Sequence, residues 1–263
     1  MFTSIVVPMD LSKPHPAAVS YAEALAGRCG AGIRLVTVVS PGRDREEGEE
    51  TLANLREYVA GDQVASEVLV SNDVAGAVLE ATGDGDLLCL ETRARGPLSA
   101  IVVGSVAGDV LRRATRPVLL VGPSARPDPS LARLLVCIDG PDAAGALVPA
   151  VAEWARRLHI LPRVASVWVP GGLHRFPGPE AASDCVRAAA DGLAAGIGVD
   201  VDWEVLRAPA APAAIVDDAV RHLASLIVVA VRPRPHLQRA LGSVAIAVAH
   251  AAEAAVLAVP LAA

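Results

Sequence analysis

The sequence is poor in lysine and in aromatic residues, and its cysteines form no motif. Lys13 is the sole lysine, aromatic residues make up 3% and the formal net charge is -6, so no basic stretch with interleaved aromatics exists to bind nucleic acid. The four cysteines form no C-x-x-C pair, and Cys89 and Cys137 interrupt apolar runs, where a free thiol is a small apolar group. We therefore expect neither a disulfide framework nor a metal site, which is typical of a reducing cytoplasm.

Signals for secretion or membrane insertion are also missing. The apolar stretch at residues 4–7 has no basic region before it and no cleavage site after it. No uncharged apolar run reaches the roughly 18 residues that a membrane span needs. The apolar stretch 245–263 is interrupted by His250, Glu253 and Pro260. We expect a cytoplasmic protein without membrane contact.

Motifs of the common catalytic sites do not occur. The sequence has no G-x-S-x-G, no G-x-x-x-x-G-K-[ST], no Cys–His signature and no suitably spaced carboxylate pair. A response-regulator receiver would need a pair of acidic residues near its start and a lysine after a late strand. Lys13, the sole lysine, lies near the start of the chain and cannot serve as that lysine. The prediction is a protein that is not an enzyme.

What the sequence does contain is a repeated α/β pattern. Hydrophobic residues make up 53%, and Val-rich runs alternate with Ala-rich amphipathic stretches, which predicts buried parallel strands and helices. The apolar run 5–10, ending in aspartate, returns at 134–139. A Gly-Ser followed by a helical stretch and an apolar strand occurs at 104–121 and again at 242–259. The repeated order indicates an internal duplication.

The duplication predicts two tandem doubly wound parallel five-stranded sheets with flanking helices. We place the first α/β domain at residues 1–122, a Pro-rich linker at 123–130 and the second domain at 131–263. The last strand of each half is very apolar, and such an edge would aggregate if exposed. We therefore expect the two halves to pair through these strands as a pseudo-dimer. The alternative is that a second chain covers the apolar edges in a homodimer.

Ligands of doubly wound sheets bind beyond the carboxyl ends of the strands, where the strand order reverses. Asp10 and Gly104-Ser105 are expected at that edge. Glycine lets the backbone approach a phosphate closely, serine adds a hydroxyl, and a helix start offers free N–H groups. The second half repeats these features at Asp139, Gly242 and Ser243. The alternative is that these aspartates and serines only cap the helices that follow them.

The loop and its surroundings resemble the nucleotide loop of the universal stress protein family. That pattern is Gly, two residues, Gly, nine residues, then Gly-Ser or Gly-Thr. Gly104 and Ser105 match, whereas Glu91 and Ala94 stand at the two early glycines. The closing apolar strand and the order of elements extend the resemblance over residues 5–121 and 134–259.

The resemblance implies a non-enzymatic stress-response regulator or scaffold. Many members of the family bind ATP and others bind no nucleotide, so ATP, together with magnesium, is the ligand expected if one is bound. The implied nucleotide-binding residues of the first half are Pro8, Asp10, Val38, Ala94, Gly104, Ser105 and Val106. Those of the second half are Asp139, Val167, Gly242 and Ser243. Cys137 stands where the first half has Pro8.

Departures from the pattern favour a second hypothesis, a nucleotide-free interaction module. A carboxylate at Glu91 placed about 5 Å from a phosphate would repel it by roughly 3 kcal/mol at an effective dielectric near 20, or about a hundredfold in affinity. Arg93 and Arg95 could compensate by pairing with phosphate or with Glu91.

The loop of the second half departs further. Pro233 and Pro235 remove backbone donors, while Arg232 and Arg234 leave the loop basic. Slow ATP hydrolysis is a third, weaker idea, because no residue is placed as its base. The protein partners stay unknown at this level.

Overall fold

A computed structural model of the chain describes residues 2–11, 17–42, 45–61, 63–92, 105–172, 174–232 and 243–261, with the side chains of Ser105 and Ser243 outside the description. Within these ranges the chain forms ten strands and eight helices. In the first half these are β1 (Ser4–Pro8), α1 (Ala17–Cys29), β2 (Gly32–Val39), α2 (Arg45–Arg56), β3 (Val64–Val70), α3 (Val74–Ala81), β4 (Asp86–Glu91), α4 (Ser105–Arg113) and β5 (Val118–Val121). In the second half they are β6 (Arg133–Cys137), α5 (Pro141–Leu158), β7 (Leu161–Trp168), α6 (Pro179–Ile197), β8 (Asp202–Arg207), α7 (Ala211–Arg221), β9 (Leu226–Val231), α8 (Ser243–Ala251) and β10 (Ala255–Pro260).

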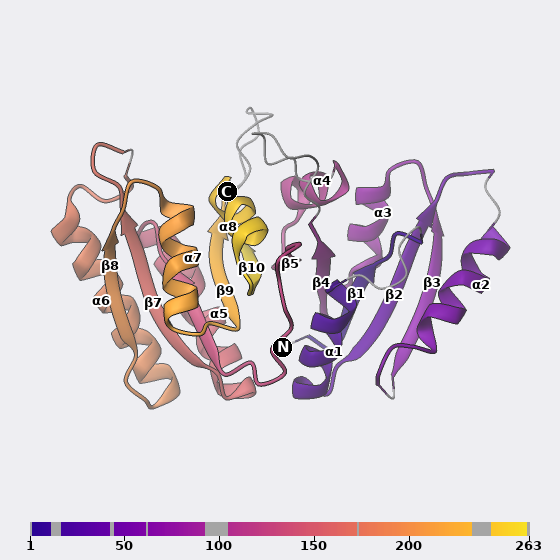
Figure 1. Ribbon diagram of the computed structural model, residues 1–263, viewed down its shortest axis with the longest axis horizontal. Helices are drawn as coiled ribbons and strands as arrows, with labels where there is room; N and C mark the ends of the chain where they lie inside the picture. The colour runs from indigo at the N-terminus through magenta and orange to yellow at the C-terminus, as the bar shows by residue number, and fades with distance from the viewer. Residues whose placement is uncertain are drawn as a thin grey trace.

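The strands form one sheet in the order β3-β2-β1-β4-β5-β10-β9-β6-β7-β8. Pairing is parallel within each half, and the halves meet where β5 and β10 pair antiparallel. The two halves therefore lie side by side with β5 and β10 between them (Figure 1). This confirms the predicted pair of doubly wound five-stranded units and their edge-to-edge pairing, which fuses the two sheets into a single ten-stranded one.

Helices cover both faces of the sheet, as its continuous apolar strands require. One apolar cluster joins a sheet face to α1, α2, α5 and α6. A second cluster joins the opposite face to α3, α4, α7 and α8. Corresponding helices of the two halves thus lie on the same face, which is the arrangement expected of a duplication.

Contacts across the β5–β10 joint tie the halves together. Leu119 and Leu257 are register partners and both are buried. The Tyr21 hydroxyl donates to the carbonyl oxygens of Arg126 at 2.7 Å and Glu253 at 3.2 Å, and burial raises the pKa of Tyr21 to about 12. The segment expected to be a linker is therefore held against both halves, while the domain boundaries themselves stay predictions.

One tryptophan of the outer strands lies outside the core. Trp203 lies in a strand, where the sequence predicts a core position for a tryptophan, but it is 37% exposed on β8, which pairs only with β7. Asp202 and Glu204 flank it on this strand, and charged side chains discourage further strand pairing at an edge. Among the described helices, none is both long enough and apolar enough to span a bilayer.

Candidate functional site

A cavity of about 530 Å³ lies at the carboxyl ends of the strands in the second half. Its walls come from the ends of β6, β7 and β9, from the loop after β7, and from the first turns of α7 and α8. Since β7 and β8 lie on one side of β6 and β9 and β10 on the other, the strand order reverses here. The cavity therefore occupies the switch point at which doubly wound sheets bind ligands.

Apolar side chains form much of the cavity wall. They come from three strands and α7: Cys137, Ala165, Val167, Val229, Ala230 and Ile215. The pKa of the Cys137 thiol is raised, first by burial and then by the carboxylates of Asp218 and Asp139. The thiol therefore stays protonated at neutral pH and serves as a packing group, not as a nucleophile.

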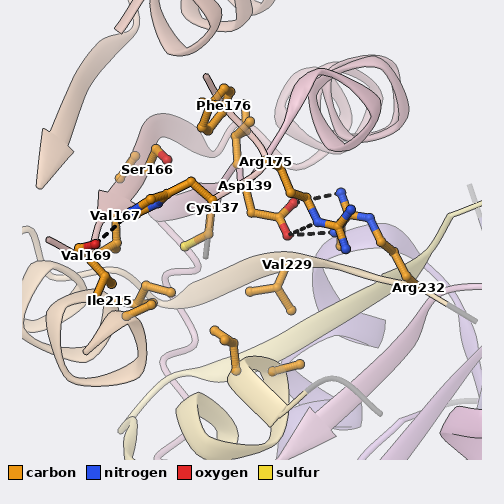
Figure 2. A pocket seen from close by; sticks show the side chains of 17 residues that line it. Cys137, Asp139, Ser166, Val167, Val169, Arg175, Phe176, Ile215, Val229 and Arg232 are labelled. Carbon is orange, nitrogen blue, oxygen red and sulfur yellow. Dashed lines mark hydrogen bonds and ion pairs between the residues drawn. The ribbon is translucent and has the colours of Figure 1, made fainter. Parts of the chain in front are cut away.

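An ion-pair cluster forms the polar rim. Arg232 donates from Nη1 to Asp139 Oδ2 at 2.6 Å and from Nη2 to Asp139 Oδ1 at 2.9 Å. The same guanidinium donates to Asp142 from Nε at 3.0 Å and from Nη2 at 2.8 Å. Arg175 Nε lies 3.6 Å from Asp139 Oδ2. Figure 2 shows the Asp139 carboxylate facing the Arg232 guanidinium across this rim.

Arg232 and Asp142 hold each other in their charged forms. Burial alone would lower the pKa of Arg232, but its bonds to Asp139 and Asp142 hold that pKa above the usual range. Burial would raise the pKa of Asp142, yet the Arg232 hydrogen bond and charge bring it below the usual range. Arg232 therefore contributes no unpaired positive charge to this loop, because two carboxylates neutralise it. Arg234 lies outside the described residues, so the basic character of the loop stays a prediction.

The loop after β7 forms the remaining wall. The His174 ring stacks on Trp168, with centroids 3.7 Å apart and planes within 4°, and His174 Nε2 lies 2.6 Å from the Val169 carbonyl oxygen. Phe176 is buried beside them. We did not predict that His174, Arg175 and Phe176 line this cavity. Their position directly after a central strand is the signal that could have indicated it.

Two of the residues predicted in the second half share the cavity. Asp139 follows β6 and Val167 lies near the end of β7, and both line it. Gly242 lies outside the described residues. Ser243 is described only as the first residue of α8, although the next residue, Val244, also lines the cavity. The capping alternative for Asp139 is wrong, because the N-cap of α5 is Gly140 and has no side-chain cap.

The residues predicted in the first half occupy corresponding elements. Pro8 ends β1, Asp10 lies exposed two residues later, Val38 is half-buried in β2 and Val106 is half-buried in α4. Ala94 and Gly104 lie outside the described residues, and Ser105 is described only as the start of α4. The first-half site therefore stays a prediction. In the described part of the chain, no group of three or more His, Cys, Asp or Glu side chains is arranged to hold a metal ion.

Comparison with known proteins gives matches over nearly all of the chain. The profile of the universal stress protein family matches residues 1–122 and 131–260. A universal stress protein from Archaeoglobus fulgidus DSM 4304 is similar in structure, with a TM-score of 0.74, 18% identity and 98% of each chain covered. The functionally unknown protein PA1789 from Pseudomonas aeruginosa PAO1 gives a TM-score of 0.66 and 20% identity, covering 99% of this chain and 93% of that one.

A putative universal stress protein from Pseudomonas aeruginosa UCBPP-PA14 gives a TM-score of 0.64 and 21% identity, covering 99% of this chain and 94% of that one. At these identities the structural likeness concerns the fold alone. Comparison of the sequence with curated proteins finds no match.

Proposed function

This chain belongs to the universal stress protein family, and from that premise we propose that it is a cytoplasmic, non-enzymatic stress-response regulator that binds an adenine nucleotide or nucleoside. The observation that carries the proposal is that Asp139 and Val167, two residues for which the family resemblance implies nucleotide contacts, lie on one cavity at the strand-order switch. The cavity volume of about 530 Å³ falls in the range of small-molecule sites, roughly 300–1,000 Å³.

The chemistry of the walls fits an adenosine group. Val167, Ile215 and Val229 offer an apolar surface of the kind that receives a planar base. Asp139 offers carboxylate oxygens that can accept hydrogen bonds from ribose hydroxyls. For the first half, ATP with magnesium stays the proposal, held by the residues that the resemblance implies there.

The state of the reactive groups supports a role without catalysis. The Cys137 thiol has a raised pKa, and Asp139 is engaged by Arg232. The His174 ring is stacked on Trp168 and lies against a carbonyl oxygen. Cys137, Asp139 and His174 are thus each held by a partner or protonated.

Titration calorimetry of the intact protein with adenosine, AMP and ATP tests the proposal. We expect at least one ligand to bind with a Kd below about 1 mM, which corresponds to about -4 kcal/mol. Val167→Trp fills the second-half cavity and should remove binding there. Val38→Trp is the matched variant for the first half, because Val38 in β2 and Val167 in β7 occupy equivalent positions. Each lies three residues after a buried residue of its strand, Leu35 in β2 and Val164 in β7.

A folded protein that gives no signal with any of the three ligands at millimolar concentration would contradict the proposal. The nucleotide-free interaction module would then be favoured. The observation on its side is the engagement of Arg232 by two carboxylates, which removes the clearest described cation from phosphate recognition.

A further inference from the structure

The Arg232 guanidinium is already occupied by ligands of its own chain. We propose that Asp142 stands in for the phosphate of a nucleotide, so that the second-half cavity selects an uncharged nucleoside over its phosphorylated forms. This inference rests on the proposed function, since it names the ligand class of the same cavity. It makes Asp142 a specificity-determining residue that acts through Arg232.

The donor count of Arg232 is the first support. A guanidinium has five N–H donors, and paired recognition of a phosphate uses two neighbouring ones. Nε donates to Asp142, Nη2 donates to both Asp139 and Asp142, and Nη1 donates to Asp139. At most one N–H, on Nη1, is left without a carboxylate. No pair of neighbouring donors remains for an incoming phosphate.

The charge balance is the second support. Asp139 and Asp142 carry two negative charges, and Arg232 and Arg175 carry two positive ones within 3.6 Å. These four described side chains are therefore close to neutral as a group, and a phosphate gains no net attraction from them. An anion could pair with two neighbouring donors of Arg232 only by displacing a carboxylate, which would then lie beside the anion as a like charge.

The position of Asp142 in α5 explains why it is not easily displaced. It lies in the first turn of α5, where the helix dipole stabilises a negative charge and where free anions commonly bind. Pro141 precedes it, and the Gly140 N-cap supplies no side-chain acceptor. The Asp142 carboxylate thus satisfies both the helix start and Arg232, as a bound phosphate would do.

The sequence of the first half shows the opposite charge at the corresponding place. Three positions after the aspartate that follows the first strand, the first half has Lys13 and the second half has Asp142. Lys13 lies outside the described residues, so this is a difference in sequence only. It suggests the substitution Asp142→Lys as the strongest reversal of ligand preference.

The experiment compares adenosine with AMP by titration calorimetry, in the full chain carrying Val38→Trp so that the second half is measured. Without further change, we expect adenosine to bind at least about tenfold more tightly than AMP. Asp142→Asn should tighten AMP binding by about tenfold and leave adenosine binding within about twofold. Asp184→Asn, which disrupts the exposed pair with Arg187 on α6, is the matched control and should change neither.

The outcomes separate the inference from the function beneath it. If neither ligand binds to any folded variant, the proposed function fails for the second half and the inference fails with it, while ATP binding by the first half is tested separately on the unsubstituted protein. If both bind but the ratio of their affinities is the same with Asp142→Asn, or AMP is already preferred with Asp142 intact, only the inference is overturned. The preference with Asp142 intact decides the matter even if a substituted chain does not fold.

Discussion

We expect Asp218→Ala to be one of the most destabilising single substitutions in the second half. Asp218 on α7 is fully buried and accepts hydrogen bonds from Arg163 on β7, Nε to Oδ2 at 3.1 Å and Nη2 to Oδ1 at 3.4 Å. Arg163 is itself only 9% exposed and also pairs with Asp202 and Glu204. Burial alone would lower the pKa of Arg163, but these carboxylates, Asp218 first, hold it above the usual range.

The magnitude follows from what the substitution leaves behind. Removing one partner of a buried ion pair costs about 3–5 kcal/mol, because the other charge stays buried and unpaired. Asp202 and Glu204 still reach Arg163, so we place the loss of unfolding free energy near the lower limit, at about 3 kcal/mol. That is more than a hundredfold in the folding equilibrium, and about 1 M in urea midpoint for a slope of 2–3 kcal/mol/M.

Urea titration followed by circular dichroism measures this directly. Asp184→Ala is the control, because its pair with Arg187 has side chains that are 71% and 59% exposed and should be worth less than about 1 kcal/mol. The double change Arg163→Met with Asp218→Leu should regain most of the loss, since an apolar pair replaces a buried ionic one at little cost. A midpoint for Asp218→Ala that equals that of Asp184→Ala would refute the reasoning.

Three further predictions concern the joint, the glycines and the pH. Leu119→Ala in the β5–β10 joint should lower the free energy of unfolding in urea by about 2–5 kcal/mol. Leu223→Ala, at a residue that is 75% exposed, should change it by no more than about 0.5 kcal/mol. Equal effects would contradict the burial of the joint. Gly122→Ala should lower the melting temperature strongly, because a Cβ there would lie 1.6 Å from a carbonyl oxygen of α8. Gly27→Ala is the control: it has open space inside α1 and should raise stability by up to about 1 kcal/mol. An unchanged melting temperature with Gly122→Ala would rule out the close approach of Gly122 to α8. The Asp128 carboxyl has a lowered pKa, chiefly because the hydroxyl of Ser225 donates to it at 2.5 Å. The ionised Asp128 therefore stabilises the fold above the unfolded pKa, which is near 4. This stabilisation is lost as the pH falls through the lower pKa of the folded state. Asp128→Asn should therefore flatten the fall in urea midpoint between pH 5 and 3, and an unchanged slope would count against this account.

Local patterns in the sequence predicted the elements because the physical causes are local. The alternating apolar pattern of residues 64–70 predicts a strand with the bounds that β3 has. Ser71-Asn72-Asp73 predicts a helix start, and Asp73 caps the short helix by accepting from the Gly76 N–H at 2.9 Å. The continuous apolar runs of β1 and β6 placed both at the centre of their halves, where parallel strands are covered on both faces. The apolar last strands likewise predicted their own pairing.

Contacts between distant residues could not be predicted in this way. Arg163 begins a Val-rich run, and nothing near it indicates that Asp218, 55 positions later, would be its buried partner. Arg232 and Asp142 are 90 positions apart, so the sequence did not indicate that Arg232 would be paired with carboxylates. Trp203 was misplaced because burial of a strand depends on its neighbours, and β8 has only one.

The antiparallel joint of β5 and β10 lies within one polypeptide, and this has an evolutionary consequence. In an assembly of two identical chains, each substitution appears at both binding edges at once. Here a substitution alters one edge and leaves the other untouched, while the tether keeps the edges at a fixed one-to-one ratio at any protein concentration. Leu120 on β5 and Ala258 on β10, which occupy equivalent places in the repeated pattern, show that the two edges have already diverged.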